Sequence, residues 1–303
     1  MIQGMRSALN FVTKPVHRWL RHLRESLATG QATLALAVLG IIAGLLAGSL
    51  VVLLRITLEW CAFTVYPTLQ TNAAIHLTLL PAWFFFLTPT IGGLIVGVIF
   101  FRLKKEQRRV GLSHVILYVH QHDARLPWQN AVAQVVGSLG CFLSGQSVGR
   151  EGPAVHLGVA INSLFGQWLR LPHNTLLILA GCGTAAAVAA SFNTPMAGVI
   201  FAMEVVLVEY TIAGFTPVVL ASVAGTALVR IVYGDAPFIQ LPQILAPGLW
   251  DLGFVMLLGA IISMASASFV SIQRYCLQFS AHPIWLRLGV AGAITGALAV
   301  IEP

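Results

Sequence analysis

The sequence predicts an all-α membrane protein in which several helices are broken within the bilayer. Of its 303 residues, 57% are hydrophobic and 9% are charged, whereas a soluble domain usually carries about 25% charged residues. Long apolar runs alternate with shorter runs that glycine, proline and polar residues interrupt. Because such backbone is tolerated at membrane depth only inside protein or around a water-filled cavity, we expect an internal polar path.

The first predicted element, within residues 1–29, is a basic amphipathic helix on the cytoplasmic surface of the membrane. Basic residues precede the first apolar run and follow the second: Arg6, Lys14, Arg18, Arg21 and Arg24, then Arg102, Lys104, Lys105, Arg108 and Arg109. Such clusters mark the cytoplasmic side, and two apolar runs between them allow both clusters to lie there. The net charge of +7 therefore needs no nucleic-acid partner.

The apolar runs 26–54 and 77–101 come next, and each is long enough to span, since about 20 apolar residues cross the hydrocarbon. Further helices are predicted over 128–143, 152–169, 174–190, 195–209, 214–232, 250–278 and 284–301. Several are too short to span. Half-helices of this kind are typical of the binding site of a channel or transporter.

A charged pair stands in the stretch VGREGPAVHLG, residues 148–158. Gly149 and Gly152 permit close approach and unusual backbone angles, and Pro153 suits the first turn of a helix. A helix start carries partial positive charge and free N–H donors, so it can bind an anion. Glu151 then either competes with an arriving anion as a gate or is an architectural helix cap paired with Arg150.

Two motifs, GREGPAVHLG at 149–158 and GCGTAAAVAASFNTPMAGVIFAMEVV at 181–206, resemble consecutive motifs of the CLC family of chloride channels and proton-coupled anion transporters. The resemblance covers about residue 30 onward. It implies the first half of an inverted-repeat domain with broken and tilted helices, over residues 30–303. It also implies that Glu151 is the gating glutamate and that the following residues bind the anion: Gly149, Arg150, Gly152, Pro153, Phe192 and Asn193. Asn193 further reads as a helix N-cap before Pro195.

The family's first anion-binding motif, which precedes these two along the chain, aligns without gaps on RVGLSHV, residues 109–115. This places Val110 where the family has a serine whose hydroxyl binds the anion. The anion would then rely on backbone N–H groups of Gly111 and Leu112. Alternatively, a shift of register makes Ser113 the ligand, or Ser113 is simply the N-cap of a following helix.

Val205 occupies the position at which proton-coupled members of the family carry a second glutamate. Valine cannot carry a proton, so the resemblance favours a passive chloride channel gated by voltage or pH. A proton/chloride antiporter is the alternative, with Glu204 either taking protons or pairing with a helix end.

The resemblance also implies a homodimer in the lipid bilayer, formed through the helices near 214–232 and 250–278. Chloride or a similar small anion would be the transported ion, no cofactor would be needed, and a bacterial inner membrane would be the location. The motifs of the family's second half are absent, so we expect these residues to represent half of a pore. The zinc-protease motif HExxH is also absent, and we expect neither an enzyme nor catalytic residues.

Histidines cluster after the basic loop, at His114, His120 and His122, next to Asp123. They form either a metal site or a polar turn at the interface, and we predict the turn and no metal. His156, one turn into the helix after Glu151, either modulates the charge of that glutamate or is a packed, hydrogen-bonded side chain.

Overall fold

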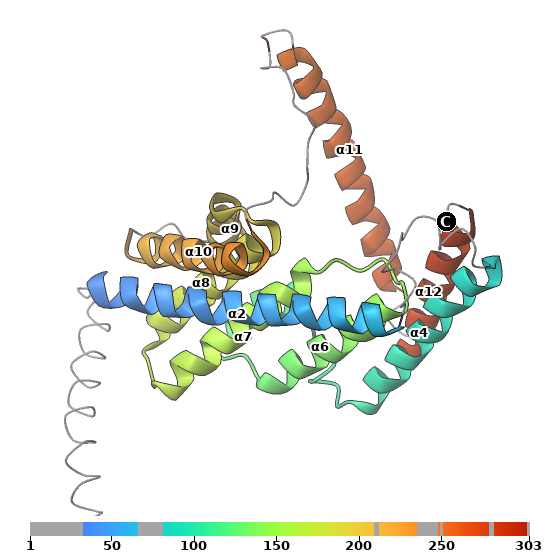
Figure 1. The fold of residues 1–303 in the computed structure, drawn as a ribbon, viewed down its shortest axis with the longest axis horizontal. Coiled ribbons are helices and arrows are strands. Elements are labelled where there is room, and N and C mark those ends of the chain that lie inside the picture. Colours follow the sequence, from blue (N-terminus) through green and yellow to red (C-terminus); the bar gives the residue numbers. More distant parts are fainter. Residues whose placement is uncertain are drawn as a thin grey trace, which may run out of the picture.

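The computed structural model describes residues 33–65, 81–208, 212–234, 248, 251–278 and 282–301, and all the regular structure in these ranges is helical. Its helices, shown in Figure 1, are α2 (Thr33–Val65), α4 (Ala82–Arg102), α5 (Leu112–Gln121), α6 (Trp128–Leu143), α7 (Glu151–Trp168), α8 (His173–Phe192), α9 (Pro195–Phe201), the π-helix η1 (Ala202–Leu207), α10 (Ile212–Tyr233), α11 (Asp251–Gln278) and α12 (Ile284–Ile301). The helix predicted within 1–29 lies outside the described residues. The predicted all-α class is confirmed.

Two elements differ from the sequence prediction. Helix α2 does not end at Leu54 but continues through Arg55 and Glu59 to Val65. Arg55 Nε lies 2.9 Å from Glu59 Oε1 one turn later, and this pairing lets a helix continue through two charges. Helix α5, which the apolar pattern did not reveal as a separate helix, is only 10 residues long.

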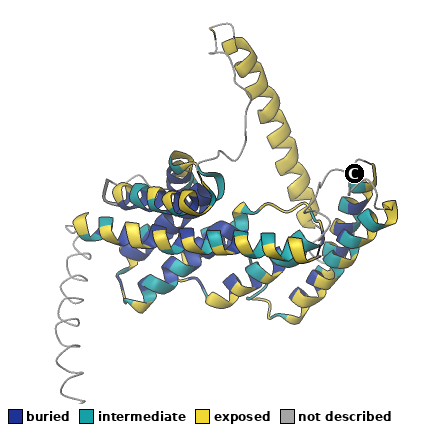
Figure 2. Ribbon diagram, in the orientation of Figure 1, coloured by how far each residue is buried: buried dark blue, intermediate teal, exposed yellow. Residues whose placement is uncertain are grey.

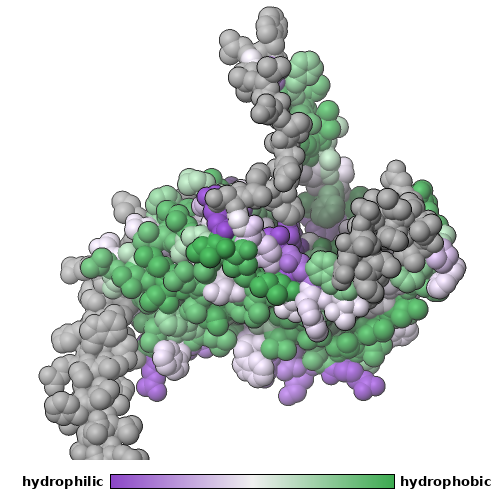
Figure 3. Space-filling model, viewed as in Figure 1, coloured by the Kyte–Doolittle hydropathy of each residue, from purple (hydrophilic) through white to green (hydrophobic). Residues whose placement is uncertain are grey.

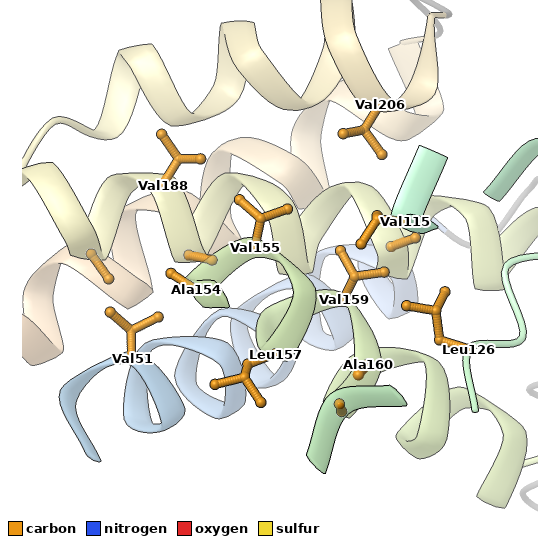
Figure 4. Close-up of a cluster of buried hydrophobic side chains, with 14 of the residues drawn as sticks. Val51, Val115, Leu126, Ala154, Val155, Leu157, Val159, Ala160, Val188 and Val206 are labelled. Atoms are coloured by element: carbon orange, nitrogen blue, oxygen red, sulfur yellow. The ribbon is translucent and has the colours of Figure 1, made fainter. Parts of the chain in front are cut away.

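The core is formed by α7 and α8, which pack side by side with α2 and α10 around α8. Figure 4 shows part of the apolar cluster, which includes Val155 and Val159 of α7 and Val188 of α8. The two helices approach most closely at Gly158 and Gly183, since a Cβ atom on either would collide with the backbone oxygen of the other. Small residues thus allow the close helix contact expected in a membrane.

A second pair, α4 and α12, is joined in the same way. A Cβ atom on Gly292 would meet the backbone oxygen of Pro89, and one on Gly296 would meet that of Phe86. Gln146, in the loop before α7, donates from Nε2 to the backbone oxygen of Pro89 at 3.0 Å. Pro89 lies inside α4, and this hydrogen bond ties α4 to the loop before α7.

Helix α11 projects from the other helices and is exposed along its whole length (Figure 2). The face of the molecule seen in Figure 3 is largely hydrophobic. Six of the described helices are long and apolar enough to cross a membrane, namely α2, α4, α8, α10, α11 and α12. By contrast, α5, α6 and α9 are 10, 16 and 7 residues long, as the prediction of half-helices requires.

Candidate functional site

Helix α7 begins at Glu151, with Arg150 as its N-cap residue. The start predicted near Pro153 is therefore confirmed to within two residues. The Glu151 carboxylate turns back over the preceding loop, where a Cβ atom on Gly149 would touch Oε2. The side chain is exposed.

The turn between α8 and α9 directly follows Ser191, which lines a cavity together with Arg150. Phe192 is the last residue of α8, and Asn193 follows it in the left-handed conformation at φ 58°. Thr194, rather than Asn193, is the N-cap residue of α9, while Pro195 occupies its first turn as predicted. Asparagine tolerates the left-handed conformation that ends a helix, which explains why the N-cap prediction for Asn193 was wrong.

Two side chains of α10 hold this turn in place. Arg230 Nε donates to Asn193 Oδ1 at 2.8 Å, and Ser222 Oγ donates to the backbone oxygen of Pro195 at 2.6 Å. Sequence reasoning missed both residues. Arg230 could have been singled out from the sequence, because it is the single charged residue of α10.

The loop before α5 is fixed by a hydrogen bond from its glycine. Gly111, the N-cap residue of α5, adopts φ 85°, and its N–H donates to Gln134 Oε1 at 2.6 Å. In this structure that N–H is therefore engaged within the protein rather than directed at an anion. The N–H groups in the first turn of α5, beginning with that of Leu112, have no acceptor within the helix.

The side chains flanking Gly111 lie in contrasting surroundings. Val110 packs against the apolar cluster that Phe100 of α4 and Ala133 of α6 help to form. Ser113 is exposed and lies inside α5 rather than at its cap. The alternative in which Ser113 is the N-cap is wrong, since Gly111 takes that position.

Arg150 lines a cavity of about 420 Å³ that opens between α2, the ends of α6 and α8, the start of α7 and the end of α10. On its opposite wall Arg55 pairs with Glu59, Tyr233 Oη donates to Glu59 Oε2 at 3.2 Å, and the Arg55 guanidinium lies 3.7 Å from the centre of the Tyr233 ring. Two arginines against one glutamate make the charged lining net positive. Sequence reasoning missed Arg55, Glu59 and Tyr233, although the charged pair one turn apart in an apolar helix was a visible signal.

Glu204 and Val205 lie in the π-helix that continues α9. Glu204 is exposed, whereas Val205 packs against the main apolar cluster. A π-helical turn is rare and often marks a functional position. Helix α5 contacts both this π-helix and α7, so the segments of all three predicted motifs adjoin one another.

The histidines after the basic loop do not gather around one point. His114 is buried, whereas His120 and His122 are exposed, and Asp123 Oδ1 lies 3.3 Å from Nδ1 of His173 instead. Within the described ranges there is no group of three or more His, Cys, Asp or Glu side chains that could hold a metal ion. The observed arrangement is that of a polar turn.

Comparison with known proteins gives consistent matches. The family model described as voltage gated chloride channel matches residues 92–303. The chain is 30% identical over 233 residues to a protein of Ralstonia nicotianae named "Putative chloride channel protein ClcB-like", covering 74% of this chain and 54% of that one. It is 32% identical over 145 residues to the H(+)/Cl(-) exchange transporter ClcA of Vibrio cholerae, covering 47% and 31% respectively.

The structure is similar to the crystal structure of a CLC-type fluoride/proton antiporter, with a TM-score of 0.71 and 25% identity, over 88% of this chain and 65% of that one. The broken-helix arrangement is therefore that of a known membrane fold. The chain spans only about half the length of these relatives. It covers 54% of the Ralstonia nicotianae protein and 59% of a second relative.

Proposed function

This chain belongs to the voltage-gated chloride channel (CLC) family, and from that premise we propose that it supplies one half of an anion pathway gated by Glu151. Members of this family are channels and transporters of the membrane rather than enzymes. The observation that carries the proposal is the start of α7, where Glu151 is the first residue and no side chain caps the helix, so the N–H groups of Glu151 and Gly152 have no acceptor within the helix. A carboxylate and a mobile anion would compete for those groups.

The charges around the site support an anion as the transported ion. Arg150 and Arg55 face the same cavity, and the paired Glu59 offsets one of them. We propose chloride or a similar small anion, with no cofactor. Val110 offers no hydroxyl donor, so backbone N–H groups at the starts of α5, α7 and α9 would supply most of the hydrogen bonds to the anion.

We propose passive conduction in preference to proton exchange, and Val205 is the reason. Its side chain cannot carry a proton, and it packs among apolar residues. Proton exchange is the second candidate because relatives of this chain are named as proton-coupled exchangers and because Glu204 stands next to Val205.

The two candidates are separated by proteoliposomes that contain the natural full-length protein and an outward chloride gradient. We expect chloride to leave without driving protons uphill, because the residue at position 205 is a valine and cannot carry a proton. A pH electrode in a weakly buffered bath records the proton movement. Uphill proton uptake that stops with a protonophore would overturn the channel proposal in favour of exchange.

We further propose that two copies associate in the bilayer through α10 and α11. Helix α11 is 28 residues long, apolar and exposed throughout, and α10 keeps part of its surface exposed. Bacterial relatives support an inner membrane as the location.

A further inference from the structure

A buried polar cluster lies where α5, α6 and α7 meet, beneath the Gly111 turn. It contains His114 of α5, Asn130 and Gln134 of α6, and His156 of α7. The exposed fraction is 3% for His114 and 0% for His156. A buried ring nitrogen without a partner is costly, so each nitrogen in this cluster requires an account.

The protonation of His156 follows from Gln134. A backbone N–H can only donate, so the Gln134 atom 2.6 Å from the Gly111 nitrogen is the amide oxygen. The same oxygen lies 3.2 Å from Nδ1 of His156, which must therefore carry a hydrogen. In the neutral ring the other nitrogen, Nε2, is then an acceptor.

The protonation of His114 follows from Asn130 in the same way. Asn130 Nδ2 donates to the backbone oxygens of Glu106 and Arg109, each at 2.8 Å, which fixes the orientation of the amide. This nitrogen also lies 3.4 Å from Nε2 of His114. The two backbone oxygens use both hydrogens of this amide, so neither hydrogen is directed at His114, and an N–H on Nε2 would point at another donor. We therefore assign the hydrogen of His114 to Nδ1.

These assignments leave one donor and one acceptor that complement each other. Nδ1 of His114 and Nε2 of His156 have no hydrogen-bond partner among the described residues. The two rings are neighbours, with centres 5.2 Å apart in an edge-to-face arrangement, so both unsatisfied nitrogens belong to one buried contact. Buried water usually occupies sites of this kind, where polar groups would otherwise be unsatisfied.

We propose that one buried water molecule accepts a hydrogen bond from Nδ1 of His114 and donates one to Nε2 of His156. The water closes a chain of hydrogen bonds that runs from the Gly111 N–H through Gln134 and His156 to His114. Gln134 is then a positioning residue, since it holds the turn before α5 against the helix that begins at Glu151. This last role rests on the proposed function, but the water and the two protonation states do not.

The test is ¹⁵N magic-angle-spinning NMR of the natural full-length protein in lipid, labelled at histidine and held at a pH where both rings are neutral. We expect both buried rings to carry hydrogen on Nδ1, the less common neutral form, and the His114 Nδ1–H to show a cross-peak to water. His114→Phe and His156→Phe assign the signals. His120→Phe, on an exposed position of α5, should leave both buried signals unchanged.

Hydrogen on Nε2 of either ring, or a His114 Nδ1–H without a water cross-peak, would overturn the proposal. A second measurement, of melting temperatures, tests the proposal even if a single variant is poorly folded. Removing one histidine leaves the other ring unsatisfied, whereas removing both does not. The fall in melting temperature of the double variant should therefore be smaller than the sum of the two single falls, and an additive result contradicts a shared water.

The positioning role is tested separately with Gln134→Leu and Gln134→Glu. Leucine removes the acceptor of the Gly111 N–H, whereas glutamate keeps an acceptor oxygen. We expect a several-fold change in the ratio of chloride to nitrate flux for leucine and recovery of the ratio for glutamate. An unchanged ratio for leucine removes the positioning role, while the NMR result still decides the water. Absence of flux in the natural protein would count against the proposed function alone.

Discussion

Replacement of Glu151 by glutamine is expected to hold the anion path open and to remove the pH dependence of anion flux. Glutamine has nearly the shape of the protonated glutamate, carries no charge and cannot titrate. It therefore cannot compete as an anion for the N–H groups at the start of α7. In the natural protein, protonation removes the charge of the blocking carboxylate, so flux should rise as the pH is lowered.

Chloride efflux from proteoliposomes at a series of pH values between about 4 and 8, a range that includes the reference pKa values of glutamate and histidine side chains, measures this effect. The matched control is Glu106→Gln, an exposed acid in the loop between α4 and α5. This control should keep the natural pH response. If Glu151→Gln keeps that response as well, Glu151 is an architectural cap and the gating role is lost.

Gly183→Val is expected to give the largest loss of folded protein among single changes in the core. A Cβ atom there would collide with the backbone oxygen of Gly158 and would lie 2.8 Å from Nδ2 of Asn162. Overpacking typically costs about 1–3 kcal/mol. A clash with backbone of the facing helix should lie at or above the upper end, because neither α7 nor α8 can yield by rotating a side chain.

The change is read by fluorescence-detected size-exclusion chromatography in mild detergent, before and after a temperature series. The control is Ala297→Val, at an exposed position of α12. We expect the control to elute as the natural protein does and Gly183→Val to be mostly aggregated. A well-folded Gly183→Val protein would show that α7 and α8 can separate without cost, contrary to the packing described above.

Helix bounds were predictable where proline marked them. The expected helices 128–143 and 284–301 match α6 and α12 residue for residue, because Pro127 and Pro283 precede them and proline disfavours helix in the residue before it. The break between α8 and α9 was also predictable from Pro195. Its detail was not, since an asparagine suits both a helix start and a left-handed helix end.

The features that were missed depend on contacts between distant residues. The bond between Gly111 and Gln134 joins positions 23 residues apart, and no local pattern in the sequence specifies it. The hydrogen bond between Tyr233 and Glu59 likewise joins positions 174 residues apart. The exposure of Glu151 also depends on how helices distant in the sequence pack around the start of α7.

The length of α2 sets a depth scale for the whole molecule. At 1.5 Å per residue, its 33 residues extend over about 50 Å, whereas the hydrocarbon layer is about 30 Å thick. Arg55 comes 22 residues after Thr33, or about 33 Å along the axis. If α2 enters the hydrocarbon at Thr33 and stands upright, Arg55, Glu59 and the cavity they line reach the level of the phospholipid headgroups. A tilted α2 draws them into the hydrocarbon instead, so bilayer thickness would set how much water the cavity holds.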